Sequence, residues 1–66
     1  SLTELLGYCL PWAEKNPSLV MIFPKGEKAD EEIAEARKHY SFDLAKTPSK
    51  TDKNATILYV SGLKKT

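Results

Sequence analysis

The stretch that decides the fold is the apolar run Leu19-Val20-Met21-Ile22-Phe23. Its residues do not alternate between apolar and polar, a pattern typical of a strand that is covered on both faces, as in a parallel sheet. Pro24, Lys25 and Gly26 follow the run and are predicted to end the strand. A strand covered on both faces is flanked by helices in an α/β fold.

An amphipathic helix is predicted upstream of this strand. Its apolar residues recur at spacings of three and one, which places on one wide stripe Leu2, Leu5, Leu6, Cys9, Leu10 and Ala13. Ser1 and Glu4 have the spacing of a capping box at its start. Pro11 lacks the N–H that a helix interior requires, so we expect a kink or an end around Leu10. Turn residues at positions 16–18 set the outer limit of the helix.

A second helix is predicted downstream of the strand. A narrower apolar stripe with steps of four, three and four is formed by Ala29, Ile33, Ala36 and Tyr40. Acidic residues at positions 30–35 lie toward its start and basic residues at 37–39 toward its end, which complements the helix dipole. The acidic residues are therefore interpreted as a solvated face rather than as catalytic acids or a metal site. His39 has no nucleophile or carboxylate arranged to use it, so we interpret it as a surface residue.

Two more strands complete the predicted sheet. Residues 42–46 alternate, which predicts a short strand at an edge, and residues 47–54 form a loop rich in turn residues. Residues 56–60 are β-branched and aromatic, and we expect them to form a central strand. Residues 62–66 are predicted to be a frayed basic tail. The order αβαββ then gives a mixed sheet in which the first two strands run the same way and the last returns between them, antiparallel.

Length and composition place the chain among small globular domains. Its 66 residues form at most one small domain, and 41% hydrophobic with 29% charged residues indicates a folded core. The single cysteine, Cys9, suits a reducing compartment, and no apolar run is long enough to span a bilayer, so we expect a cytoplasmic protein. The chain opens without Met, and we expect residues 1–66 to be one partial domain cut from something longer.

Several short motifs carry a resemblance that covers nearly the whole chain. They are Leu5-Leu6, Cys9-Leu10-Pro11, Ile22-Phe23-Pro24-Lys25-Gly26, Glu31-Glu32-Ile33-Ala34-Glu35-Ala36, Pro48-Ser49-Lys50-Thr51-Asp52 and Ile57-Leu58-Tyr59-Val60. Together they resemble the carboxyl-terminal third of the GidB (RsmG) family. The chain departs from that pattern at positions 54–56, where many family members carry an arginine, and Lys53 is the nearest basic residue.

The resemblance implies both a fold and an activity. Members of this family are AdoMet-dependent methyltransferases that act on N7 of a guanine in 16S ribosomal RNA. They have a Rossmann-like fold with a mixed seven-stranded sheet, and their final strand is inserted antiparallel beside the strand before it. The chain is therefore expected to be the carboxyl-terminal fragment of such an enzyme, with 16S ribosomal RNA or the small ribosomal subunit as its partner.

The resemblance also implies that S-adenosyl-L-methionine serves the parent enzyme. The family's glycine-rich loop and ribose-binding acid lie upstream of this region. The three glycines of the chain, Gly7, Gly26 and Gly62, are too far apart to cradle a cofactor. We expect no cofactor, no metal ion and no catalytic residue in the fragment, and no methyl transfer from it alone.

A basic rim is the candidate site. Ligands of open α/β sheets bind outside the carboxyl ends of parallel strands. The candidate RNA-binding residues there are Lys25, Gly26, Lys46, Ser49, Lys50 and Lys53. Lysines at such a rim can neutralise phosphates, although loops also carry lysines simply because they are wet. Trp12 and Tyr40 could stack on bases, but packing in the core is the preferred interpretation for both, as it is for Cys9.

Two other functions remain open. The chain could be a free-standing small α/β module that binds nucleic acid or a protein through the same rim, or a fragment without activity. An incomplete sheet should expose apolar surface, so self-association through its edge is expected.

Overall fold

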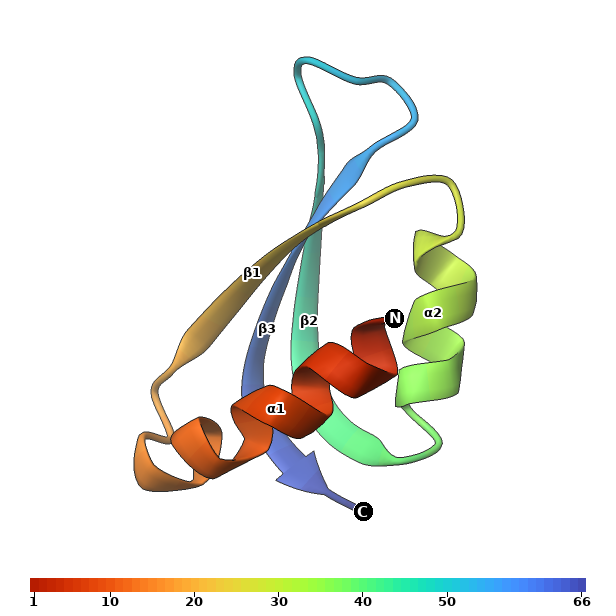
Figure 1. Ribbon diagram of the computed structural model, residues 1–66. Coiled ribbons are helices and arrows are strands. Elements are labelled where there is room, and N and C mark those ends of the chain that lie inside the picture. The colour runs from red at the N-terminus through yellow and green to blue at the C-terminus, as the bar shows by residue number, and fades with distance from the viewer.

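The computed structural model describes all 66 residues as two helices and one three-stranded sheet. The elements follow the order α1 (Leu2–Lys15), β1 (Val20–Lys25), α2 (Ala29–Ala36), β2 (Tyr40–Pro48) and β3 (Thr56–Lys65). Both helices cover the same face of the sheet (Figure 1). The α/β class and the αβαββ order are therefore confirmed.

The last strand is the central strand. The sheet has the order β1-β3-β2, and β3 pairs antiparallel with both neighbours. The predicted position of the final strand is confirmed. The expected mixed sheet is wrong at the level of hydrogen bonding, because β3 separates the two strands that run in the same direction and leaves only antiparallel pairs.

The core lies between the sheet and the two helices. It is formed by Leu2, Leu6, Ala13, Met21, Ile33, Ala36, Phe42, Leu58, Val60 and Leu63. Leu58 and Val60 are fully buried because β3 is flanked on both sides by strands and covered by helices above. Burying such apolar side chains is the main favourable contribution to folding.

The strand β1 is an edge strand with one covered face. Met21 is 7% exposed, whereas its neighbours Val20 and Ile22 are 53% and 60% exposed. The expectation of a strand covered on both faces is wrong for this chain, because helices lie on only one side of the sheet. The strand also continues through Pro24 to Lys25, since an edge strand tolerates a residue without an N–H.

The first helix stays within its predicted outer limit at Asn16. Of the two alternatives at Leu10, an end is excluded, because α1 continues through Pro11 to Lys15 and closes with a hydrogen bond from Asn16 N–H to the Trp12 carbonyl. The predicted cap is present: Ser1 Oγ accepts from Glu4 N–H at 3.3 Å. The second is shorter than predicted, since α2 ends at Ala36.

The residues that follow α2 change role accordingly. His39 lies in the turn after α2 and Tyr40 begins β2, so neither belongs to the helix. The N–H groups of Lys38 and His39 bond back to the carbonyls of Glu35 and Ala36, which tightens the last turn. This turn lets the chain leave the helix and enter the sheet.

The predicted frayed tail is wrong. Residues 62–65 belong to β3, where Lys64 and Lys65 face Ser41 and Tyr40 of β2, and Leu63 is 3% exposed. The pairing shifts register between Ser41 and Asp43, which is a bulge. Gly62 lies at this irregularity with φ +62°, the left-handed conformation that glycine adopts without steric cost.

Replacing Gly62 with alanine is expected to destabilise the fold. A Cβ at Gly62 would lie 2.9 Å from Asp43 Oδ2 and would force a left-handed backbone on alanine, at a cost of about 1–2 kcal/mol. Urea denaturation of Gly62→Ala measures this loss. Gly26→Ala is the matched control, because a Cβ there meets no atom within 4 Å. Equal unfolding midpoints for the two variants would contradict the assigned strain.

Candidate nucleic-acid interface

The two outer strands end on the same side of the sheet. Lys25, the last residue of β1, and Pro48, the last residue of β2, both face Thr56 at the start of β3. The rim defined by residues 25, 26, 46, 49, 50 and 53 therefore lies at one end of the molecule. The geometry expected for this rim is confirmed, whereas RNA binding by its residues stays a prediction.

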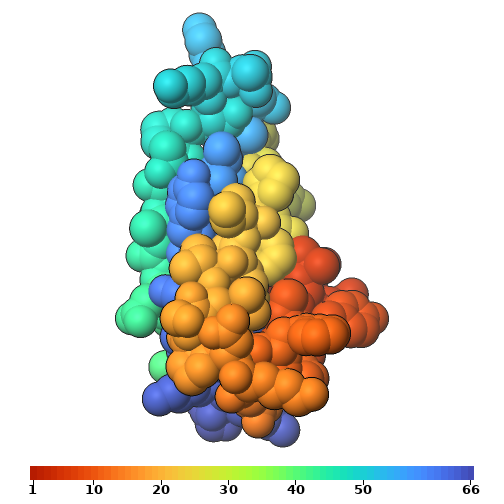
Figure 2. All heavy atoms as spheres, turned by 90° about the vertical axis from the view of Figure 1, so that its left-hand side faces the viewer, coloured from red at the N-terminus to blue at the C-terminus, as the bar shows by residue number.

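The loop between β2 and β3 forms the outermost part of the rim. It projects beyond the rest of the fold in two views (Figure 1, Figure 2). The loop is closed by hydrogen bonds from Ser49 N–H to the Ala55 carbonyl at 3.0 Å and from Asn54 N–H to Asp52 Oδ1 at 2.9 Å. Lys50 and Lys53 are exposed on it, and neither forms an ion pair.

The Ser49 hydroxyl is already engaged within the loop. Its Oγ accepts a hydrogen bond from Thr51 N–H at 3.3 Å and lies 3.2 Å from Thr51 Oγ1. Such a local bond from a short polar side chain stabilises a turn. The position of Ser49 on the rim is as predicted, and its present contact is structural.

Lys25 lies in a junction of three elements rather than in open solvent. Its ammonium lies 3.1 Å from Glu32 Oε1 of α2, and the two side chains are only 15% and 26% exposed. The same carboxylate oxygen accepts from Leu2 N–H, at the start of α1, at 2.9 Å. That N–H has no partner within its own helix, so Glu32 caps α1 from outside.

The pKa of Glu32 records this junction. Partial burial of the carboxyl raises its pKa, but the hydrogen bonds from Lys25 and Leu2 N–H lower it, as do the charges of Lys25 and the terminal amino group. The net pKa lies below its usual value. The ionised carboxylate is thus the form that the junction stabilises.

Lys46 forms a second ion pair of a different kind. Its Nζ lies 3.2 Å from Asp30 Oδ1, but the two side chains are 49% and 85% exposed. Exposed pairs of this type contribute about 0–1 kcal/mol because water screens them. Lys46 is therefore held only weakly, in contrast to Lys25.

Glu32 and Asp30 are the site residues that the sequence pattern missed. Both were interpreted as part of a solvated helix face, yet each pairs with a lysine of the rim. The pairing follows from topology, because α2 begins directly after β1 and its first turn stays beside the end of the sheet. Only the placement of β1, α2 and β2 together could have indicated it.

The other candidate residues are separate from the rim. Trp12 is 68% exposed, so its predicted packing is wrong, while Cys9 and Tyr40 are partly buried against the core as expected. His39 Nε2 lies 3.6 Å from Glu35 Oε1, so the expectation that no carboxylate lies beside it is wrong, although both side chains are exposed on the surface as predicted for His39. No group of three or more His, Cys, Asp or Glu residues is arranged to hold a metal ion.

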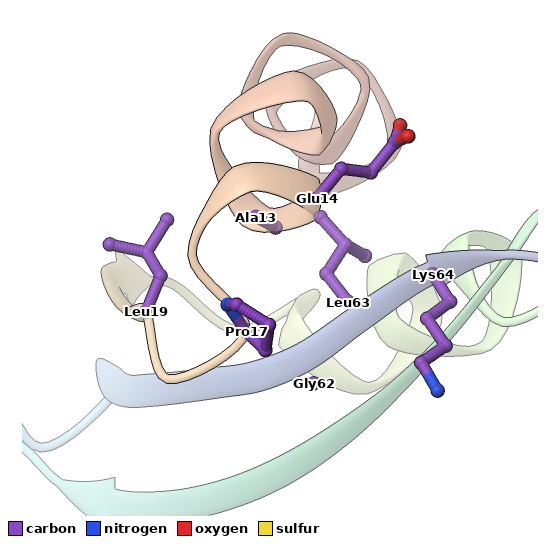
Figure 3. Close-up of a pocket in the computed structure, with 7 residues that line it drawn as sticks. All are labelled: Ala13, Glu14, Pro17, Leu19, Gly62, Leu63 and Lys64. Atoms are coloured by element: carbon purple, nitrogen blue, oxygen red, sulfur yellow. The ribbon is translucent and has the colours of Figure 1, made fainter.

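One pocket of about 300 Å³ lies at the opposite end of the sheet from the rim. It is lined by Ala13, Glu14, Pro17, Leu19, Gly62, Leu63 and Lys64. The charged ends of Glu14 and Lys64 point apart, so the pocket itself is mostly apolar (Figure 3).

α1 and α2 both lack the length and the hydropathy that a membrane-spanning helix requires.

The glycines do not form a cofactor cradle. Gly7 lies inside α1, Gly26 follows β1 and Gly62 lies in β3, so they come from three separate elements. A dinucleotide-type cradle needs closely spaced glycines between a strand and a helix. The three glycines therefore do not form the closely spaced loop that such a cradle requires.

Comparison with known proteins finds several relatives that share one name. The chain is 42% identical over 62 residues to ribosomal RNA small subunit methyltransferase G of Allorhizobium ampelinum, which covers 94% of this chain and 29% of that protein. A protein of the same name from Hyphomonas neptunium is 39% identical over 89% of this chain and 28% of its own length. A third, from Brucella ovis, is 37% identical over 98% of this chain and 30% of its own length.

The match extends along almost the whole chain but over less than a third of each relative. No protein-family model matches the chain, and no solved structure matches it. The resemblance found in the sequence motifs is nevertheless confirmed by these relatives. Along almost its whole length, the chain thus resembles one part of the proteins named ribosomal RNA small subunit methyltransferase G (GidB/RsmG).

Proposed function

We propose that the chain is the carboxyl-terminal part of an AdoMet-dependent methyltransferase that modifies guanine N7 in 16S ribosomal RNA. The observation that carries this proposal is the similarity of 94% of the chain to a protein named ribosomal RNA small subunit methyltransferase G. The part described here completes the sheet and builds one wall of the RNA cleft. We place the enzyme in the cytoplasm, because its proposed substrate belongs to the ribosome.

The distribution of exposed apolar residues supports a larger Rossmann-like sheet. The large exposed hydrophobic residues are Leu5, Tyr8, Trp12, Val20 and Ile22. All of them belong to α1 and β1, which form much of the face in Figure 2. β1 also has one edge without a strand. A strand beside that edge, a helix beside α1 and a helix on the open face of the sheet, toward which Val20 and Ile22 point, would cover this surface. We therefore infer that the parent domain continues past β1.

The chemistry of the reaction indicates which parts of the enzyme bind AdoMet and which bind RNA. When bound, AdoMet supplies the electrophilic methyl group, and we assign its binding to parts of the enzyme outside these 66 residues. Guanine N7 carries an accessible lone pair, so the transfer requires positioning of the base rather than a group that removes a proton. The proposed task of the rim is to hold the RNA backbone by phosphate contacts, which position without reading sequence.

A free-standing binding module is the second candidate. The rim with its exposed Lys50 and Lys53 would serve such a module equally well. The two candidates differ at β1, because a complete module should not leave an unpaired strand edge beside exposed Val20 and Ile22. That difference favours the methyltransferase fragment.

Residues 1–66 by themselves are expected to transfer no methyl group. They contain no glycine-rich cradle for AdoMet, so the donor cannot be held near the RNA. Incorporation of radiolabelled methyl from AdoMet into small-subunit ribosomal RNA measures this. The full-length Allorhizobium ampelinum relative is the matched positive control, and turnover by the 66 residues would contradict the assignment.

RNA binding through the rim is expected to depend on salt. Each lysine that neutralises a phosphate adds about 0.7–0.9 to the slope of log K against log salt concentration. The double substitution Lys50→Gln with Lys53→Gln should therefore lower the slope for small-subunit ribosomal RNA by about 1.4–1.8. Lys64→Gln with Lys65→Gln removes the same charge at the other end of β3 and should leave the slope unchanged. An equal fall of the slope in both double variants would show that the RNA contact is not confined to the rim.

The chain is expected to associate through β1. A second copy can cover the exposed edge and the apolar side chains beside it. Ile22→Lys should make the chain monomeric in sedimentation experiments, because it places a charge on the 60% exposed Ile22. Thr47→Lys is the matched control, since Thr47 is exposed on β2 at the other edge. A wild-type chain that is strictly monomeric would count against an incomplete sheet.

A further inference from the structure

The lysines of the rim are not equivalent in their surroundings. Lys25 is almost covered and pairs with a partly buried carboxylate, Lys46 pairs with a carboxylate in open solvent, and Lys50 and Lys53 have no acidic partner. A phosphate must compete with any carboxylate already paired to a lysine. The structure therefore ranks these four side chains by how readily each can meet RNA.

Moving Lys25 to a phosphate would leave Glu32 without its cation. The Glu32 side chain is only 26% exposed, so water compensates an unpaired charge there poorly. The loss would also disturb the cap on α1, because the same oxygen accepts from Leu2 N–H. Moving Lys46 to a phosphate would cost little stability, because Asp30 is 85% exposed and water solvates its carboxylate when the lysine leaves.

The Lys25 junction joins β1, whose end belongs to the rim, to both helices, and α2 also carries the Asp30 that pairs with Lys46. Lys25 ends β1, Glu32 lies in the first turn of α2, and Leu2 begins α1. The chain passes from β1 to α2 through Gly26, the neighbouring rim residue. Through Glu32, Lys25 thus fixes where the start of α2 lies relative to the end of the sheet.

We propose that Lys25 is a positioning residue of the RNA surface, held by Glu32, and that Lys46, Lys50 and Lys53 are the cations that meet phosphates. This division rests on the proposed function, because it takes the rim as the RNA surface. It departs from the sequence-based expectation that Lys25 itself binds RNA. Lys25 then stabilises the site and does not contribute a released counterion.

The test compares single substitutions in two measurements, the salt slope for small-subunit ribosomal RNA and the urea unfolding midpoint. Lys50→Gln should lower the slope by about 0.7–0.9 and leave the midpoint unchanged. Lys25→Gln should keep the slope and lower the midpoint. Lys25→Arg should restore the midpoint, because a guanidinium can also pair with Glu32.

A pH profile separates the Lys25–Glu32 pair from general damage to the core. Glu32 faces Lys25 from β1, and Leu2 N–H and the terminal amino group from α1. Because its pKa is lowered on folding, its stabilising effect is present above its ordinary value of 4.5 and is lost as the pH falls through the lowered pKa. The wild-type chain should therefore unfold at a higher urea concentration than Glu32→Gln at neutral pH, and this difference should vanish at acid pH. At neutral pH, the difference that Glu32→Gln makes should be smaller when Lys25→Gln is also present.

The outcomes distinguish this inference from the proposed function. A slope that falls as much in Lys25→Gln as in Lys50→Gln would overturn the positioning role and make Lys25 a phosphate contact. A wild-type chain that binds the RNA without salt dependence would instead overturn the RNA surface as a whole. In that case the midpoint and pH measurements would still report whether Lys25 and Glu32 are coupled.

Discussion

The structure depends on the placement of β3 between β1 and β2. Backbone hydrogen bonds hold β3 on both edges, and the helices bury its side chains Leu58 and Val60 completely. An antiparallel strand between two strands that run the same way brings both of their carboxyl ends to one side. The rim, the Lys25 junction and the projecting loop all follow from that single arrangement.

The existence of α1, β1 and β3 could be predicted from the sequence, because each contains a stripe or a run of apolar residues, and the order of the strands followed from their apolarity. The burial of the run before Pro24 could not be predicted, since Val20 and Ile22 are exposed. Boundaries were less predictable, because pairing partners decide them. β3 continues to Lys65 only because the start of β2 is available to pair with it.

The site was predictable in place but not in detail. Lysines at and beyond the carboxyl ends of two strands that run the same way gather at one end of the molecule, and this requires only the topology. Which lysine is covered depends on the carboxylates of α2, and no local pattern connects Lys25 with Glu32 or Lys46 with Asp30. Trp12 was predicted to pack but is exposed. An aromatic residue near a helix end is buried only if the residues that would cover it belong to the same chain.

The order of the strands in space also governs when the sheet can form. During synthesis β1 and β2 emerge before β3, yet neither pairs with the other. Within these 66 residues, the two outer strands gain a hydrogen-bonded partner only when β3 has emerged, and one of the two pairings spans more than thirty residues of sequence. Contacts between distant segments slow folding. Loss of the ten residues of β3, Thr56–Lys65, would consequently remove every strand pairing of the sheet rather than shorten it.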